Sequence, residues 1–88
     1  MTKSRETCIE ALMTIEFSIQ TAEHEMETAK RKIANELDNS LEMIDADYIR
    51  RYADIMAKAN ERRKSLVESR DMVAAMKKVF DDEVQHED

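Results

Sequence analysis

The amino-acid sequence predicts an all-α fold: an antiparallel two-helix coiled-coil hairpin that dimerises into a four-helix bundle. Its 88 residues include no glycine and no proline, and 39% are charged while 42% are hydrophobic. Apolar residues also recur at alternating steps of three and four along two long stretches. This spacing keeps one stripe of a helix against a partner helix. The stripe must be buried, so the chain packs on itself, on a copy or on another protein.

The first helix is expected over residues of about 3–38. Thr7 followed by Glu10 matches a capping box near its start, and the turn-prone cluster 38–40 marks its end. Its stripe consists of Cys8, Leu12, Ile15, Ile19, Ala22, Met26, Ala29 and Ile33.

A turn is expected over residues of about 39–46, because the next stripe positions, Glu36 and Ser40, are polar. Either Asn39 or Asp45 can cap the helix that follows. A shift of the stripe inside one continuous helix is the alternative, and such a helix would be roughly 120 Å long. We favour the hairpin.

The second helix is expected over residues of about 47–82, followed by a frayed acidic tail at 83–88. Residues 1–88 thus form a single helical-hairpin domain. The stripe of this helix reads Tyr52, Ile55, Ala59, Arg62, Leu66, Ser69, Val73, Met76 and Phe80.

Two registers align the stripes of the two helices. In the preferred one, the residue numbers of facing positions sum to about 84 or 85, so Met76 meets Cys8 and Tyr52 meets Ile33. A slip of one heptad gives sums near 78 and leaves Met76 and Phe80 overhanging.

Charge is divided between the helices. Residues 1–47 carry 11 acidic and 5 basic side chains, whereas residues 48–80 carry 4 acidic and 9 basic ones. This division favours antiparallel pairing within the chain. Because the acidic helix compensates the basic one, we do not expect binding to nucleic acid.

Arg62 is the register-setting residue that the stripe predicts. A charged side chain in a seam can pair across it and fix alignment at a cost in stability. Glu23 and Glu25 are its candidate partners, and the alternative is that Arg62 extends past Ala22 into solvent.

Several apolar residues lie off the stripes at the end of the hairpin away from the turn, the open end. A two-helix hairpin covers one face of each helix, so this apolar excess predicts a protein interface. A homodimer is the simplest cover, and an unidentified protein partner is the alternative. The expected interface residues are Ile9, Met13, Phe17, Met72, Val79 and Phe80.

No constellation of residues indicates an enzyme, a cofactor or a metal site, so we expect no catalytic, cofactor-binding or metal-binding residues. The absence of glycine excludes the usual phosphate-binding loops. His24 lies among acidic residues on a solvated face, and the Glu83–His86 spacing occurs once, whereas di-metal bundles use it twice. We expect Cys8 to be a buried thiol.

The chain has no apolar run of the roughly 20 residues that span a bilayer and no signal-peptide core. We therefore expect a cytoplasmic protein with no membrane contact. The expected function is a small non-enzymatic interaction module, such as an adaptor, subunit chaperone or inhibitor, that docks through apolar helix faces. A purely structural self-assembling bundle is the alternative, followed by a nucleic-acid-binding dimer using the basic helix.

Overall fold

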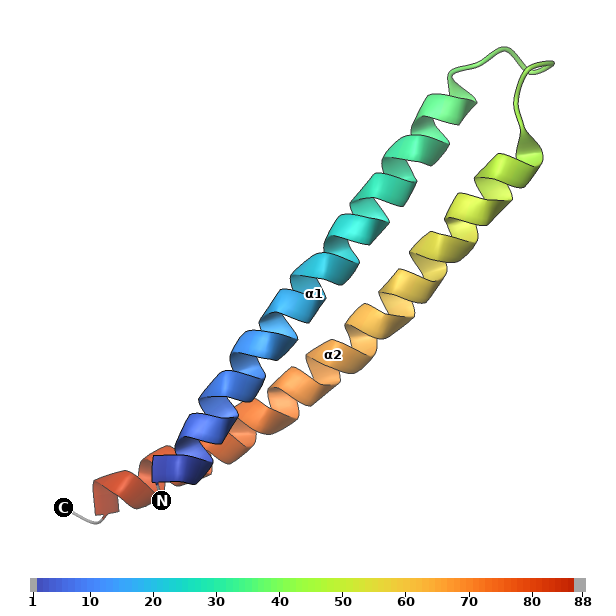
Figure 1. Cartoon of the computed structure of the whole chain (residues 1–88). Coiled ribbons are helices and arrows are strands. Elements are labelled where there is room, and N and C mark those ends of the chain that lie inside the picture. Colours follow the sequence, from blue (N-terminus) through green and yellow to red (C-terminus); the bar gives the residue numbers. More distant parts are fainter. Residues whose placement is uncertain (1, 87–88) are drawn as a thin grey trace.

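The computed structural model describes residues 2–86, which form two long helices joined by a loop (Figure 1). Helix α1 is Thr2–Leu37 and helix α2 is Ala46–His86. The helices pack side by side and antiparallel, so the loop lies at one end and the two ends of the chain lie at the other. The Cα atoms extend over 71 × 14 × 14 Å. The predicted all-helical hairpin is confirmed, and the single continuous helix is wrong.

Two predicted helix ends differ from the structure. Thr7 lies inside α1, where its hydroxyl donates to the Lys3 carbonyl at 2.9 Å, so it does not start the helix. Helix α2 continues through Glu83 to His86, where fraying was expected. Residues 83–86 include no glycine or proline that would end the helix. Just before them, Asp81 forms ion pairs with Arg5 and Lys77. The rest of the predicted tail, residues 87–88, lies outside the described residues.

Carboxylate side chains hold the loop between the helices. One oxygen of Glu36 accepts hydrogen bonds from the Asn39 side-chain amide and from the Asp45 backbone N–H, both at 3.0 Å. Asp45 in turn accepts from the Tyr48 N–H at 3.1 Å and caps α2. Of the two predicted caps, the structure uses Asp45. The loop needs no glycine, since the described residues adopt no positive φ.

Ion pairs between the helices identify the register. In each pair the two residue numbers add to 86 or 87, close to the preferred register and far from the slipped one. The pairs are Arg5–Asp81 at 2.5 Å, Glu16–Arg70 at 3.0 Å and Glu25–Arg62 at 2.6 Å. The slipped register is therefore wrong. Arg62 pairs with Glu25, one of its two candidate partners, and it does so at the exposed edge of the seam.

The stripe of α1 faces α2 as predicted. Its eight members are all buried or half-buried. The most enclosed are Cys8, Ile19, Ala22 and Ala29, each at most 5% exposed. The first helix therefore supplies four of the five hydrophobic residues that form the described core, and Ala59 of α2 is the fifth.

The stripe of α2 is rotated relative to the prediction. Half of the predicted stripe does face α1, namely Tyr52, Ala59, Leu66, Val73 and Phe80. The other half is exposed, namely Ile55, Arg62, Ser69 and Met76. The residues that take their place, one position further along, are the half-buried Met56, Arg63, Arg70 and Lys77.

The physical reason for this rotation is that long cationic side chains can cover apolar surface with their methylene stems while the charged ends reach the edge. Arg70 meets Glu16 there, and Lys77 meets Asp81 at 2.8 Å. The hydrogen bond that Arg70 donates to the Glu16 carboxylate raises the pKa of Arg70. The rotation has a cost at Arg63, whose Nε is buried without a hydrogen-bond partner in the described structure.

The Asp45 cap yields a first prediction. Replacing Asp45 with alanine should lower the free energy of unfolding by about 1 kcal/mol, because the Tyr48 N–H loses its acceptor. Asp45→Ser should retain most of the stability. Glu42→Ala is the matched control, since it removes an exposed loop carboxylate. Urea unfolding followed by circular dichroism, at one protein concentration, measures all three; equal losses in Asp45→Ala and Glu42→Ala would contradict the cap.

Asp81 yields a second prediction, on pH. Hydrogen bonds from Lys77 and then Arg5 lower the pKa of Asp81 below its ordinary value of 3.8. A lowered folded-state pKa adds stability above the ordinary value, and that stability disappears as pH falls through the folded-state pKa. Asp81→Asn should therefore be less stable than the parent at neutral pH, and the two should converge below about pH 4.

The exposed neighbour Asp82 gives the control for this pH series. Asp82→Asn should leave the pH dependence of thermal unfolding close to that of the parent protein. A stability difference between parent and Asp81→Asn that stays constant through the acid range would show that Asp81 is not linked to folding.

The Glu25–Arg62 pair yields a third prediction. Its side chains are 40% and 51% exposed, so solvent screens the pair and its coupling should be only about 0.5 kcal/mol. A double-mutant cycle with Glu25→Ala and Arg62→Ala, measured by urea unfolding, tests this value. The same cycle with Glu23 in place of Glu25 should give no coupling. If the two cycles agree, Arg62 does not select the register through Glu25.

Candidate protein-interaction surface

The two long sides of the hairpin differ in chemistry. On one side, small and uncharged side chains of α1 run beside exposed residues of α2. We call this side the neutral face and define it by Ser4, Thr7, Ala11, Thr14, Ser18, Thr21, Glu25 and Thr28 of α1 with Ile55, Arg62, Ser69, Met72, Met76 and Val79 of α2. The opposite side, the charged face, includes Glu16, Glu23, Glu27, Lys30, Arg63, Arg70, Lys77 and Asp81.

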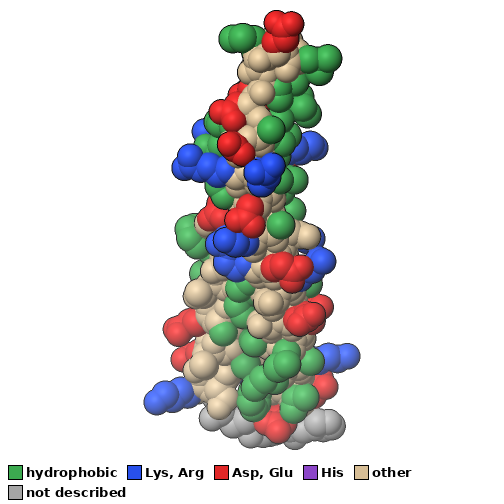
Figure 2. All heavy atoms as spheres, turned by 90° about the vertical axis from the view of Figure 1, so that its right-hand side faces the viewer, with side chains coloured by type: hydrophobic (Ala, Val, Ile, Leu, Met, Phe, Trp, Pro, Cys, Tyr) green, Lys and Arg blue, Asp and Glu red, His purple; other side chains and the backbone are tan. Residues whose placement is uncertain are grey.

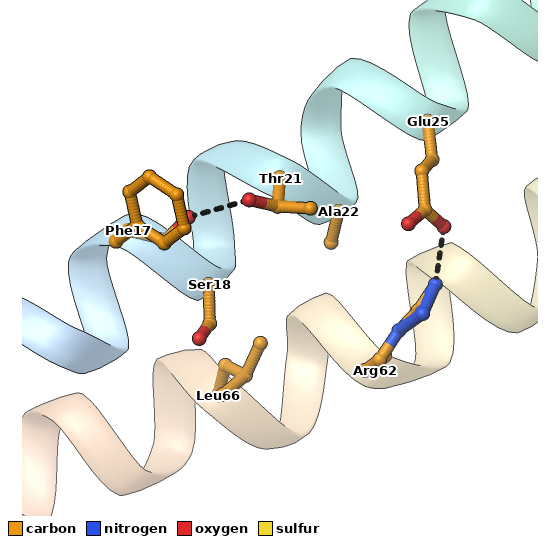
Figure 3. Close-up of a pocket in the computed structure, with 7 residues that line it drawn as sticks. All are labelled: Phe17, Ser18, Thr21, Ala22, Glu25, Arg62 and Leu66. Carbon is orange, nitrogen blue, oxygen red and sulfur yellow. Dashed lines mark hydrogen bonds and ion pairs between the residues drawn. The ribbon is translucent and has the colours of Figure 1, made fainter.

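The neutral face is hollowed at three levels. Near the open end, a hollow of about 360 Å³ is lined by residues that include Thr7, Cys8, Met76 and Phe80. In the middle, a hollow of about 320 Å³ lies between the helices (Figure 3). Toward the loop, a third of about 310 Å³ is lined in part by Ala29, Tyr52 and Ile55. The seam is therefore only shallowly covered on this side.

The middle hollow brings together side chains from both helices (Figure 3). Phe17, Ser18, Thr21, Ala22 and Glu25 of α1 line it with Arg62 and Leu66 of α2. The ion pair between Glu25 and Arg62 spans the two helices at one end of this hollow. It is the one cross-helix pair of the three described above that lies on the neutral face.

Threonine hydroxyls on the neutral face already have hydrogen-bond partners. Thr7, Thr14 and Thr21 each donate to the carbonyl four residues earlier in α1, at 2.9, 3.1 and 3.0 Å. A hydroxyl paired in this way can be covered without leaving an unsatisfied donor. This part of the surface can thus lose its water at little cost.

Large apolar side chains form the α2 edge of the neutral face. Met72 is 67% exposed, Met76 49%, Val79 56% and Ile55 36%. Three of these four lie near the open end, where Figure 2 shows hydrophobic side chains gathered beside the last described residues. The spacing of Met72, Met76 and Val79 is that of a helix stripe. A neighbouring helix is the structure that such a stripe fits.

The structure divides the predicted interface residues into two groups. Met72 and Val79 lie on the neutral face, Phe80 lines its open-end hollow, and Phe17, 71% exposed, lines its middle hollow. Ile9 and Met13 line none of the three hollows; Ile9 is half-buried and Met13 is 68% exposed. The predicted set is therefore not one patch.

The prediction missed Met76 and Ile55, because their spacing assigned them to the seam. A signal for their exposure does exist in the sequence. Steps of three and four also connect a second run along α2: Ile55, Lys58, Arg62, Ser65, Ser69, Met72, Met76 and Val79. This run is exposed throughout.

The basic residues of α2 are largely paired. At least six of its nine cations form ion pairs within the chain, and those at residues 50, 58, 64 and 77 pair within α2 itself. The compensation that the charge division predicted is therefore present. Few of these cations are left to contact phosphate.

Within the described residues, no group of three or more His, Cys, Asp or Glu side chains is placed to hold a metal ion. His24 is exposed, and Cys8 is a buried free thiol. The Glu83–His86 spacing involves a side chain outside those described. In residues 2–86, neither helix is long and apolar enough to cross a membrane.

Comparison of the chain with protein-family models, curated proteins and solved structures finds no match. No relative therefore suggests a function for the neutral face. Its role has to be inferred from the side chains, contacts and exposed area described above.

Proposed function

We propose that the protein is a non-enzymatic helical interaction module that works as a homodimer, with two hairpins packed neutral face to neutral face as a four-helix bundle. The observation that carries this proposal is the exposed half of the α2 stripe, Ile55 and Met76, extended by Met72 and Val79. These residues have helix-packing spacing but no helix against them in the described structure. A second copy of the hairpin would supply two helices to pack against them.

Exposed area supports the dimer. A globular monomer of 10.3 kDa exposes about 5,400 Å², whereas this chain exposes 6815 Å², an excess of about 1,400 Å². A standard protein interface buries about 800 Å² on each partner. The excess is therefore large enough to supply a full interface with a second hairpin.

The thin core is the second support. The five buried hydrophobic residues are three alanines, Cys8 and Ile19, and the described residues include no large side chain that is fully enclosed. A single hairpin of this kind obtains little stability from apolar burial, because each helix has one neighbour. Packing two hairpins together places a second layer over Leu66, Met76 and Phe80.

Low charge on the neutral face is the third support. Burying an unpaired charge costs several kcal/mol, so a face rich in Ser, Thr and Ala is easier to cover than the charged face. The Glu25–Arg62 pair is already joined, and about half of each side chain can stay at the rim of the dimer. Two more cations lie on this side: Lys3 at the open-end hollow, and Lys58, which pairs with Asp54 at 3.0 Å. Cys8 would remain reduced in the cytoplasm, where we place the protein.

The paired cations of α2 favour a protein partner over nucleic acid, because backbone phosphate attracts cations that lack a compensating charge. A purely structural bundle would use the same dimer interface. An interaction module and a purely structural bundle differ in one respect: the dimer of an interaction module binds a further protein, and that of a structural bundle does not.

The dimer yields a fourth prediction. Met72→Glu combined with Met76→Glu places four carboxylates in the interface of a dimer, so the mass in solution should fall from twice 10.3 kDa to 10.3 kDa. Light scattering after size-exclusion chromatography measures this mass. Circular dichroism should show lower helicity as well, because the isolated hairpin has a thin core.

Met13→Glu is the matched control, because Met13 is equally exposed, at 68% against 67% for Met72, but lines none of the three hollows of the neutral face. It should keep the mass of the dimer. A parent protein that is monomeric at micromolar concentration, or a Met13→Glu variant that dissociates while the double variant does not, would overturn the proposed interface.

A further inference from the structure

The loop end of the hairpin displays large apolar side chains. Leu41 is 90% exposed, Met43 72% and Leu37 56%. We call these three residues the tip. They lie at the far end of the molecule from Met72, Met76 and Val79, so they do not belong to the open-end part of the neutral face.

Negative charge surrounds the tip. Residues 33–49 contain five acidic side chains and no basic one, and Arg50, the next residue, pairs with one of these acids, Asp47, at 3.0 Å. These acids are Glu36, Asp38, Glu42, Asp45 and Asp47. Figure 2 shows hydrophobic and acidic side chains side by side at this end of the molecule. The tip is thus an apolar knob with an acidic rim.

The backbone of the tip is held in place before any partner arrives. The Met43 N–H donates to the Ser40 carbonyl at 2.8 Å, and the Asn39 N–H donates to the Glu36 carbonyl at 3.2 Å. The Glu36 side chain ties Asn39 to Asp45. Ordering a loop on binding costs affinity, and a loop that is already hydrogen-bonded avoids much of that cost.

We propose that the tip docks into a second kind of protein, in an apolar pocket rimmed by lysine and arginine. Charge complementarity identifies this partner: apolar side chains fill a pocket while the acidic rim meets cations. A second copy is disfavoured because two acidic tips repel each other. Nucleic acid and anionic lipid surfaces are disfavoured for the same reason.

The tip is a separate surface from the neutral face, and its proposal goes beyond the dimer. Each hairpin of a dimer would carry its own tip, so a dimer would offer two docking knobs. Failure of the dimer would leave the tip intact on a monomeric hairpin, and failure of tip docking would leave the dimer intact.

The test uses a short amphipathic helical peptide of leucine and lysine as the probe, with a leucine and glutamate peptide of equal length as its counterpart. Fluorescence anisotropy with the full chain gives the affinity, and amide resonances of isotope-labelled protein locate the site. We expect the lysine peptide to bind, to shift resonances of residues 37–45 most, and to weaken as salt rises from about 50 to about 300 mM. The glutamate peptide should not bind.

Leu41→Ser combined with Met43→Ser should weaken the lysine peptide by about tenfold or more, because the anchors are lost while all five acids remain. Met13→Ser should bind like the parent, because Met13 is about as exposed as Met43, at 68% against 72%, but lies outside the tip. Since Leu41 and Met43 contact solvent, helicity and mass should not change in the double variant, so a loss of binding cannot be attributed to unfolding.

Several outcomes would overturn the proposal. These are unchanged affinity in the double variant, shifts spread along α1 with none concentrated in the tip, and equal binding of the two peptides. Cosedimentation with phosphatidylglycerol vesicles that depends on Leu41 and Met43 would instead identify a membrane as the occupant.

Discussion

The architecture depends on which half of the α2 stripe faces α1. Tyr52, Ala59, Leu66, Val73 and Phe80 face α1 whichever half is chosen. Two sets of residues could make the remaining contact with α1. The first set follows these residues by three positions and consists of Ile55, Arg62, Ser69 and Met76. The second set follows them by four positions and consists of Met56, Arg63, Arg70 and Lys77. The structure uses the second set, which is mostly cationic, and in it Arg70 reaches Glu16 of α1. The first set, which includes Ile55 and Met76, is exposed.

Much of the fold could be predicted from sequence because its signals are local or periodic. The α1 stripe, the break before the loop and the Asp45 cap each depend on a few neighbouring residues. The register followed from matching two stripes end to end. The rotation of α2 could not be read in this way, because its two alternating runs share five positions. Ion pairs with residues distant in the sequence select between the two runs, and these ion pairs cannot be predicted from the spacing of apolar residues.

The same rotation limits what could be predicted of the interaction surface. Apolar residues off the seam predicted an interface at the open end, and the structure shows Met72, Met76 and Val79 exposed there. The sequence did not predict which side of the hairpin these residues occupy, because that side depends on how far each helix is rotated about its own axis. Phe17 lines the middle hollow of the neutral face and Met13 does not, although their spacing suggested a single patch. The exposure of Leu41 has no periodic signal, since it follows from the path of the loop.

Charge is arranged so that the two proposed surfaces differ in what they can bind. A surface that pairs with its own copy meets identical charges, so a face with few charges, most of them in ion pairs, suits self-association. An acidic apolar tip repels its own copy and attracts a basic partner. If the neutral face instead bound a foreign protein, nothing would disfavour self-pairing through the same residues, and dimerisation would compete with that function. Two separate surfaces, the neutral face along one side of the hairpin and the tip at its loop, would avoid this competition.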